Sequence, residues 1–169
     1  MIFNLILKGK VLFRTYGLLL LVFYISVLSG CATLSSERSK SITLLIKSKN
    51  LKINDAGFIH FYKNYTNLQI YASGKSILDL RIKDQICVNG ACDDKLVFNQ
   101  KFFLSSHYAG LLEDILNQNP IYFGADLVTT SCGFEQIISK ISVEYKVCDG
   151  KMSFVDQKND IKIIMKEID

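Results

Sequence analysis

The sequence predicts an α+β domain in which a helix packs on an antiparallel sheet. Apolar residues alternate with polar ones in several short runs, and turn-forming residues separate those runs, as in a β-meander. Asn89-Gly90 and Asp149-Gly150 each stand between two such runs and are typical of two-residue hairpin turns. One segment, 105–119, instead has apolar residues three and four positions apart, which indicates an amphipathic helix.

Residues 1–30 are expected to form an export signal. Three basic residues, Lys8, Lys10 and Arg14, precede an apolar run of 12 residues, and small residues follow that run. This is the order of a signal peptide. A membrane-spanning helix needs ~20 apolar residues, so the run is short for one. The apolar residues 1–7 nevertheless keep a transmembrane anchor open as the alternative.

The four residues Leu28-Ser29-Gly30-Cys31 resemble the lipobox of bacterial lipoproteins. The resemblance implies cleavage before Cys31, a diacylglycerol on its thiol and usually a further acyl chain such as palmitate. Residue 32 is Ala and not the Asp that looks like an inner-membrane retention signal. We therefore expect a lipid anchor in the cell outer membrane, with the protein facing the periplasm. Residues 31–41 are expected to be a lipidated tether, because those after Cys31 are small and polar.

Residues 42–169 are expected to form a single domain that does not bind nucleic acid. Removing 30 of the 169 residues leaves 139, which is an ordinary size for one domain. Removing three of the 20 basic residues leaves 17, against 16 acidic ones. The basic excess of the full sequence thus comes from the signal, and a basic nucleic-acid-binding surface is not expected.

Four cysteines remain once Cys31 is assigned to the lipid, and they are Cys87, Cys92, Cys132 and Cys148. An even number in an exported chain predicts two disulfides. A two-residue turn at Asn89-Gly90 puts Cys87 opposite Cys92 at disulfide distance, which leaves Cys132 for Cys148. A zinc site made of the four cysteines is the alternative, although such sites prefer two closely spaced pairs.

The first strands are expected from Lys52 onward. Phe58–Tyr62, Leu68–Ala72 and Ile77–Ile82 are strand-like runs separated by turn residues, and they predict an antiparallel meander. Residues 42–47 before them form a short apolar run whose periodicity allows a strand or a helix. We favour the helix.

The hairpin tip at Asn89-Gly90 carries Ile86 and Val88 on the face opposite the sulfur atoms. Apolar residues at a rigid, exposed tip suggest contact with a membrane or an acyl chain. A tip that folds under the domain is an equal alternative. The alternation breaks at Asp93-Asp94, where we expect a bulge or the end of close pairing.

The helix in segment 105–119 is expected to begin at Ser105 or Ser106 and to end before Pro120. We interpret its apolar stripe as core, with a lid that contacts lipid as the alternative. Segment 121–140 suits either a short helix or a strand.

Two closing hairpins are expected after that segment. Val143, Tyr145 and Val147 alternate before the Asp149-Gly150 turn, and Met152 and Phe154 return opposite Val147 and Tyr145. A last strand is expected to carry the apolar residues Ile161, Ile163 and Met165.

No catalytic centre, metal site or cofactor is expected. His60 falls in the middle of a strand and His107 at a helix start, and neither lies near a nucleophile, metal-binding or phosphate-loop motif. The acidic residues are scattered, and no pair stands out as a general acid and base. The sequence therefore favours a protein that is not an enzyme.

The order of elements resembles the LolB family, outer-membrane receptors that accept lipoproteins from a periplasmic carrier. The likeness rests on segments Met152–Asp156 and Ile161–Met165, on the helix end Leu112–Leu116 before Pro120, and on the lipobox. It covers about residues 52–169. It implies a LolA–LolB-like fold, that is, a curved antiparallel sheet or half-open β-barrel with helices covering the concave face.

The same resemblance implies binding of the acyl chains of lipoproteins or lipids and help with their insertion into the membrane. It implies a periplasmic carrier as a possible partner, and it puts Val88 in the place of the family's exposed apolar residue that releases lipid. The alternative is a structural or interaction lipoprotein with a fully packed core, such as an outer-membrane assembly partner or a surface adhesin.

Overall fold

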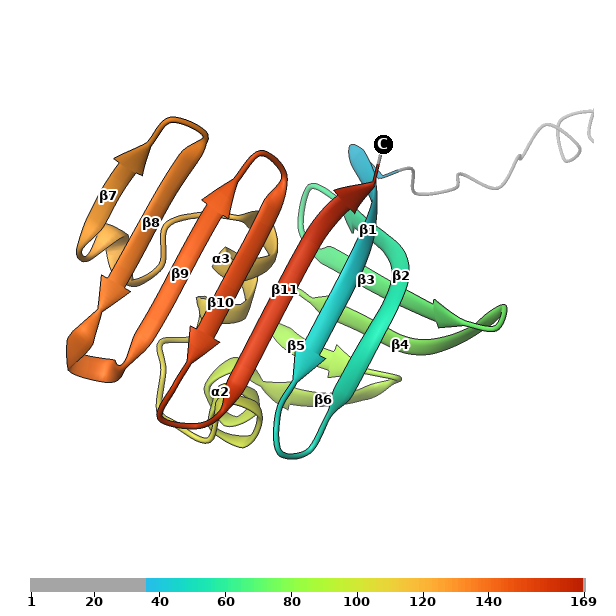
Figure 1. Cartoon of the computed structure of the whole chain (residues 1–169). Coiled ribbons are helices and arrows are strands. Elements are labelled where there is room, and N and C mark those ends of the chain that lie inside the picture. Colours follow the sequence, from blue (N-terminus) through green and yellow to red (C-terminus); the bar gives the residue numbers. More distant parts are fainter. Residues whose placement is uncertain (1–35, 169) are drawn as a thin grey trace, which may run out of the picture. The chain divides into compact units, whose positions relative to one another are not determined.

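The computed structural model describes residues 36–168, most of which form one antiparallel sheet of 11 strands (Figure 1). Strands account for 55% and helices for 17% of the structure. The strands are β1 (Arg38–Lys47), β2 (Lys52–Phe61), β3 (Thr66–Ala72), β4 (Lys75–Ile82), β5 (Gln85–Val88), β6 (Ala91–Asp94), β7 (Leu127–Thr130), β8 (Gly133–Ile138), β9 (Val143–Cys148), β10 (Lys151–Asp156) and β11 (Ile161–Ile168). The helices are α2 (Lys95–Phe103), α3 (Leu111–Asn117) and two short 3-10 helices, η1 (Tyr122–Gly124) and η2 (Ser139–Ile141).

The described chain starts and finishes in the middle of the sheet. The strand order is β6-β5-β4-β3-β2-β1-β11-β10-β9-β8-β7, so β1 and β11 lie side by side. From β1 the chain moves strand by strand to one edge at β6, crosses through α2 and α3 to the other edge at β7, and returns to β11 (Figure 1). Neighbouring strands within each half of the sheet are thus consecutive in the sequence, and the long-range pair β1–β11 joins the two halves.

The expected α+β class, with helices covering the concave face of a curved sheet or half-open barrel, is wrong. The fold is mostly sheet, and its two α-helices have only nine and seven residues. Part of the reason lies in segment 121–140, where a helix and a strand were both possible. Residues 127–130 pair with 133–136 as the hairpin β7–β8, and β8 then pairs along its whole length with β9.

Residues 42–47 belong to strand β1, so the helix that we favoured there is also wrong. Ile42, Leu44 and Ile46 alternate with more exposed residues and are all buried, and β1 pairs with a strand on each side. The strand begins at Arg38, inside the predicted tether, and the guanidinium carbon of Arg38 lies 4.2 Å from the centre of the Phe61 ring. The folded part therefore begins earlier than residue 42.

The predicted meander and the predicted closing hairpin are confirmed. The expected runs at 68–72 and 77–82 form most of β3 and β4, and the run at 58–62 covers the end of β2, which begins earlier, at Lys52. Val147 lies opposite Met152 and Tyr145 opposite Phe154, because Asp149 and Gly150 both have positive φ, 45° and 71°, as a two-residue hairpin turn requires.

The predicted helix at 105–119 is confirmed only over α3. It begins after Gly110, without a side-chain cap from Ser105 or Ser106, and it ends at Gln118 in the left-handed conformation with φ 58°. Its apolar stripe is core, since Leu111, Leu112, Ile115 and Leu116 are buried.

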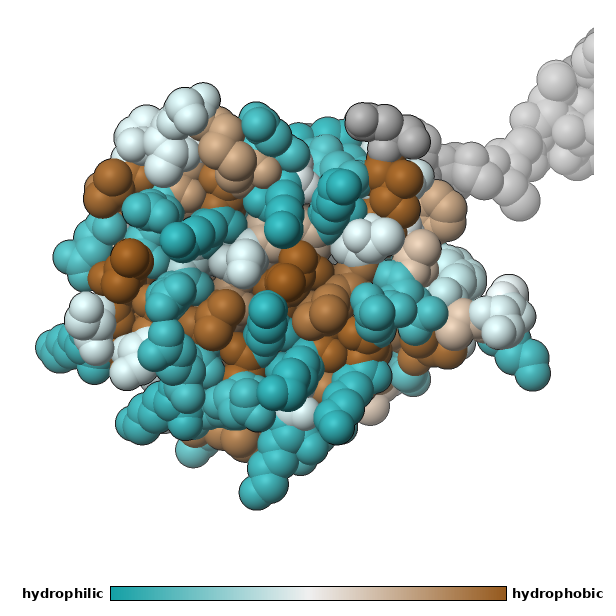
Figure 2. Space-filling model, viewed as in Figure 1, coloured by the Kyte–Doolittle hydropathy of each residue, from teal (hydrophilic) through white to brown (hydrophobic). Residues whose placement is uncertain are grey.

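One face of the sheet and the two helices share the core. Inward residues of the strands join the apolar stripe of α3 and Phe103 of α2 in one cluster. The opposite face of β1, β2 and β7–β11, turned to the viewer in Figures 1 and 2, is largely hydrophilic with scattered hydrophobic residues, whereas β3–β6 run behind β1 and β2 in this view. The two faces of each strand therefore offer different chemistry.

Candidate functional site

An apolar pocket of about 280 Å³ lies between helix α2 and the core face of the sheet. Leu78 and Leu80 of β4 and Val88 of β5 line it from the sheet. Phe98 and Phe102 line it from α2, and Ile46 and Leu51 line it from the β1–β2 hairpin. Its lining is predominantly apolar, as in sites for small apolar ligands, although its volume is near the lower end of their ~300–1,000 Å³ range.

Local sequence rules place helix α2 over this pocket. The Asp94 carboxylate accepts a hydrogen bond from the Leu96 amide at 2.9 Å, which caps the helix. Phe98 and Phe102 stand four residues apart and therefore share one helix face, where their rings stack with centroids 5.6 Å apart. Phe102 also packs edge-on against the fully buried Phe103. The aromatic wall of the pocket is thus held by the core.

Four polar residues line the pocket beside the apolar ones. Lys101 of α2 donates hydrogen bonds to both carboxylate oxygens of Asp93, at 2.8 and 2.9 Å. Ser48 and Asn50 are the other two. The polar end group of an apolar ligand could lie among these side chains.

Ile86 and Val88 do not form an exposed tip, and the alternative of a tip that folds under the domain agrees with the structure. Ile86 is buried in the core, and Val88 is half-buried and packs against it. The reason is the pairing of β5 with β4, which puts Ile86 beside Ile82 and Val88 beside Leu80 on the core face. The hairpin lies against the domain, and Val88 lines the apolar pocket.

Two exposed apolar residues of α2 escaped the sequence analysis because the helix itself was not predicted. Leu96 is 54% and Val97 is 44% exposed on the outside of this helix. At Asp93-Asp94 we expected a bulge or the end of close pairing, and the pairing of β6 does end at Asp94, which is also the N-cap of α2. The signal was present in the sequence, since a capping Asp precedes apolar residues spaced four apart.

A buried polar cluster around His107 lies next to α3. His107 forms a hydrogen bond through Nδ1 with the Tyr122 hydroxyl, while its Nε2 is buried without a partner among the described residues. Burial lowers the pKa of His107, and the nearby Asp156 carboxylate opposes this effect. Burial also raises the pKa of Tyr122 to about 12. The Tyr108 hydroxyl donates to Asp114 at 2.8 Å, so this cluster joins α3 to the loops around it.

His60 lies on the other side of the sheet, apart from His107. Its Nδ1 is 2.7 Å from the Ser39 hydroxyl oxygen, and its ring stacks on Phe58 with centroids 6.1 Å apart. The structure does not bring the two histidines together.

Both predicted disulfides are confirmed. Cys87 is bonded to Cys92 across the β5–β6 hairpin, and Cys132 is bonded to Cys148 between the start of β8 and the end of β9. The two pairs lie in opposite halves of the 11-stranded sheet, too far apart for the four sulfur atoms to share one zinc ion.

The signal 1–30, the lipobox and Cys31 lie outside the described residues. Within 36–168, no helix is both long and apolar enough to cross a membrane. No family model matches the chain, and no curated protein matches it significantly.

Proposed function

We propose that this protein is a non-enzymatic lipoprotein that binds acyl chains of lipids or other lipoproteins and helps insert them into the outer membrane. Cys31 would hold it at that membrane, and a periplasmic carrier is a possible partner. The observation that supports this function best is the apolar pocket beneath α2, with an aromatic wall on one side and aliphatic strand residues on the other.

The size of the pocket suits part of one acyl chain. A water molecule occupies ~30 Å³ in the liquid, and we take the same volume for one methylene group. The pocket of about 280 Å³ then holds about nine methylene groups. At ~0.8 kcal/mol for each buried methylene, uptake contributes about 7 kcal/mol before the several kcal/mol that association costs. The net affinity is weak, which suits a protein that must release its ligand.

The outside of α2 supports a position close to lipid. Leu96 and Val97 are exposed on the same helix that walls the pocket. A membrane surface would cover these two side chains at the moment when a bound chain leaves past Lys101.

The test compares two valine substitutions in the full-length protein. Val88→Phe fills the pocket with an apolar side chain and keeps the core contacts of Val88, whereas Val128→Phe adds the same group at an exposed position of β7, 56% exposed. A fluorescent lipopeptide should bind the wild type and the Val128→Phe variant but bind the Val88→Phe variant at least about tenfold more weakly. Equal binding by all three proteins, or no lipid found by native mass spectrometry after purification, contradicts the proposal.

A structural or interaction lipoprotein is the second candidate, and the free edge of β7 favours it. Val128 of β7 and Ile137 of the neighbouring strand β8 are more than half exposed, and Phe123 before β7 is 98% exposed. Unpaired strand edges with apolar side chains are typical partner-binding surfaces. Crosslinking in cells separates the two candidates. One stoichiometric partner supports the structural or interaction lipoprotein, whereas transient contact with many lipoproteins supports the acyl-chain-binding protein.

A further inference from the structure

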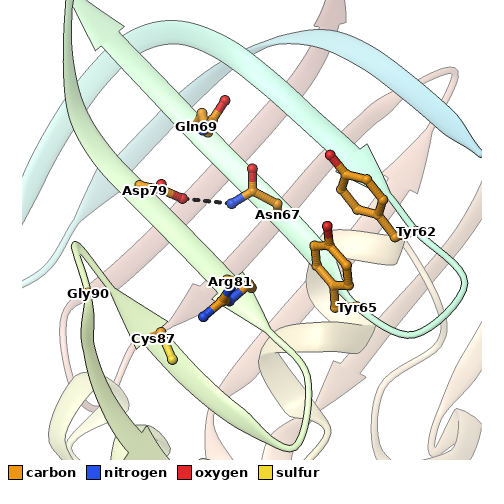
Figure 3. A pocket seen from close by; sticks show the side chains of 8 residues that line it. All are labelled: Tyr62, Tyr65, Asn67, Gln69, Asp79, Arg81, Cys87 and Gly90. Carbon is orange, nitrogen blue, oxygen red and sulfur yellow. Dashed lines mark hydrogen bonds between the residues drawn. The ribbon is translucent and has the colours of Figure 1, made fainter. Parts of the chain in front are cut away.

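A second pocket, of about 310 Å³, lies on the outer face of the sheet over strands β3 to β5 and the turns beside them (Figure 3). It is separate from the apolar pocket beneath α2, because side chains alternate between the two faces of a strand and the two pockets lie on opposite faces. On β4, Leu78 and Leu80 point to the core, whereas Asp79 and Arg81 point outward into this second pocket. A ligand in the second pocket would therefore not depend on what the first pocket binds.

One end of the pocket is aromatic. Tyr62 and Tyr65 flank the β2–β3 turn, where the Tyr62 amide donates to the Tyr65 carbonyl at 2.9 Å. Their rings stack with centroids 4.1 Å apart and an angle of 11° between the planes. Figure 3 shows both tyrosines at one end of the pocket, with Cys87 and Gly90 at the other. The electron-rich face of such a ring attracts positively polarised C–H groups.

The middle of the pocket offers both hydrogen-bond donors and acceptors. The Asn67 amide nitrogen donates to Asp79 at 2.6 Å, and the Tyr71 hydroxyl donates to the Gln69 carbonyl oxygen at 3.1 Å. This arrangement leaves the Asn67 carbonyl oxygen and the second Asp79 oxygen as acceptors, and the Gln69 amide nitrogen as a donor. In the part of the chain that the structure describes, Arg81 forms no ion pair or side-chain hydrogen bond.

The far wall is pre-formed. The Asn89 amide donates to the Asp79 carbonyl at 2.8 Å, and the Asn89 side-chain oxygen accepts from the Asp79 amide at 2.8 Å. The Cys87–Cys92 disulfide then ties the two strands of this hairpin together. A wall held in this way loses little conformational entropy when a ligand binds.

We propose that this outer pocket binds a pyranose ring of a glycan. A pyranose has a C–H face that can stack on Tyr65, and its hydroxyl groups both donate and accept hydrogen bonds, as the middle of the pocket requires. The two charged residues that line the pocket, Asp79 and Arg81, have opposite signs, so a neutral ligand fits better than an anion or a cation. A nucleotide would also stack on Tyr65, but its phosphates need a basic surface that Asp79 disfavours.

Isothermal titration calorimetry of the full-length protein tests this site with three probes. Glucose oligomers and N-acetylglucosamine oligomers represent free glycans, and vesicles that contain a glycolipid represent a lipid head group. Saturable binding is expected to at least one probe, and the probe that binds identifies the source of the sugar. Adenosine monophosphate serves as the competing planar ligand.

Variants tie the binding to the pocket. Tyr65→Ala and Arg81→Ala should each weaken saccharide binding about tenfold or more, whereas Tyr65→Phe keeps the ring and should stay within about threefold of the wild type. Phe58→Ala is the matched control, because Phe58 is 45% exposed on the same face and does not line the pocket. Absence of saccharide binding, unchanged binding by the Tyr65→Ala variant with an unchanged melting temperature, or tighter binding of the nucleotide overturns the proposal.

Discussion

The two disulfides should contribute differently to stability and to ligand binding, and removing each pair in turn measures the difference. The first variant replaces Cys87 and Cys92 by Ala, and the second replaces Cys132 and Cys148 by Ala. None of the four residues is buried in the core, so neither variant removes core packing. For stability, the comparison therefore isolates the effect of the covalent link.

The expected magnitudes follow from the loops that the bonds close. Cys87 and Cys92 are five residues apart, and Cys132 and Cys148 are 16 apart. In the chain-entropy description, a crosslink over a loop of these lengths stabilises the fold by about 2 and about 3 kcal/mol, respectively. The second variant should thus lose about 1 kcal/mol more of unfolding free energy than the first.

Urea unfolding followed by far-ultraviolet circular dichroism measures the stability difference, since the chain has no Trp for fluorescence. Calorimetry with the saccharide that binds measures the functional difference. The variant without Cys87 and Cys92 should lose affinity severalfold, because its bond stiffens one wall of the outer pocket. The variant without Cys132 and Cys148 should keep its affinity. A larger stability loss in the first variant, together with unchanged affinity, refutes the reasoning.

Three further predictions concern stability. Burial lowers the pKa of His107. The unfolded state therefore binds more protons than the folded state near and below pH 6.5, the ordinary pKa of histidine. The free energy of unfolding should fall as the pH drops from 7 to 5.5, by at most ~1.4 kcal/mol per pH unit. His107→Gln should make the melting temperature less dependent on pH across this range, and an unchanged pH dependence contradicts the prediction. Gly57→Ala should cost about 1–3 kcal/mol in urea unfolding, because an added Cβ would lie 2.0 Å from a backbone oxygen of β3, and a neutral effect would show that β3 moves freely. Asp94→Ala removes the cap of α2 and should lower the free energy of unfolding in urea by about 1 kcal/mol. Asp93→Ala is the control, because it breaks only a surface ion pair. If Asp94→Ala lowers the free energy of unfolding less than Asp93→Ala does, the cap does not have this role.

The hairpins were predictable because turn chemistry is local. Asn89 and Gly90 both adopt positive φ, 50° and 88°, and only a few residue pairs do so readily. That turn fixed the register, and the register put Cys87 opposite Cys92. The cysteine pairing could therefore be derived without any knowledge of the rest of the fold.

The apolar pocket was not predictable, because it depends on contacts between distant parts of the chain. The pattern placed Ile86 and Val88 on one face of the hairpin but could not show which face turns to the core. That choice is made by the pairing of β5 with β4. Helix α2 likewise has few residues and depends on Phe98 and Phe102 packing against the core, as short helices generally do.

Strand β4 links the two proposed sites. Because side chains alternate along the strand, Leu78 and Leu80 line the apolar pocket, and Asp79 and Arg81 line the outer pocket. Strand β5 repeats the division, with Val88 on the inside and Cys87 on the outside. A one-residue slip of either strand would exchange the two sets of side chains and abolish both pockets together. The Asn89–Asp79 hydrogen bonds tie the β5–β6 turn to β4 and so oppose such a slip. These hydrogen bonds to the backbone of β4 therefore maintain the shape of both pockets, although the two ligands would never meet.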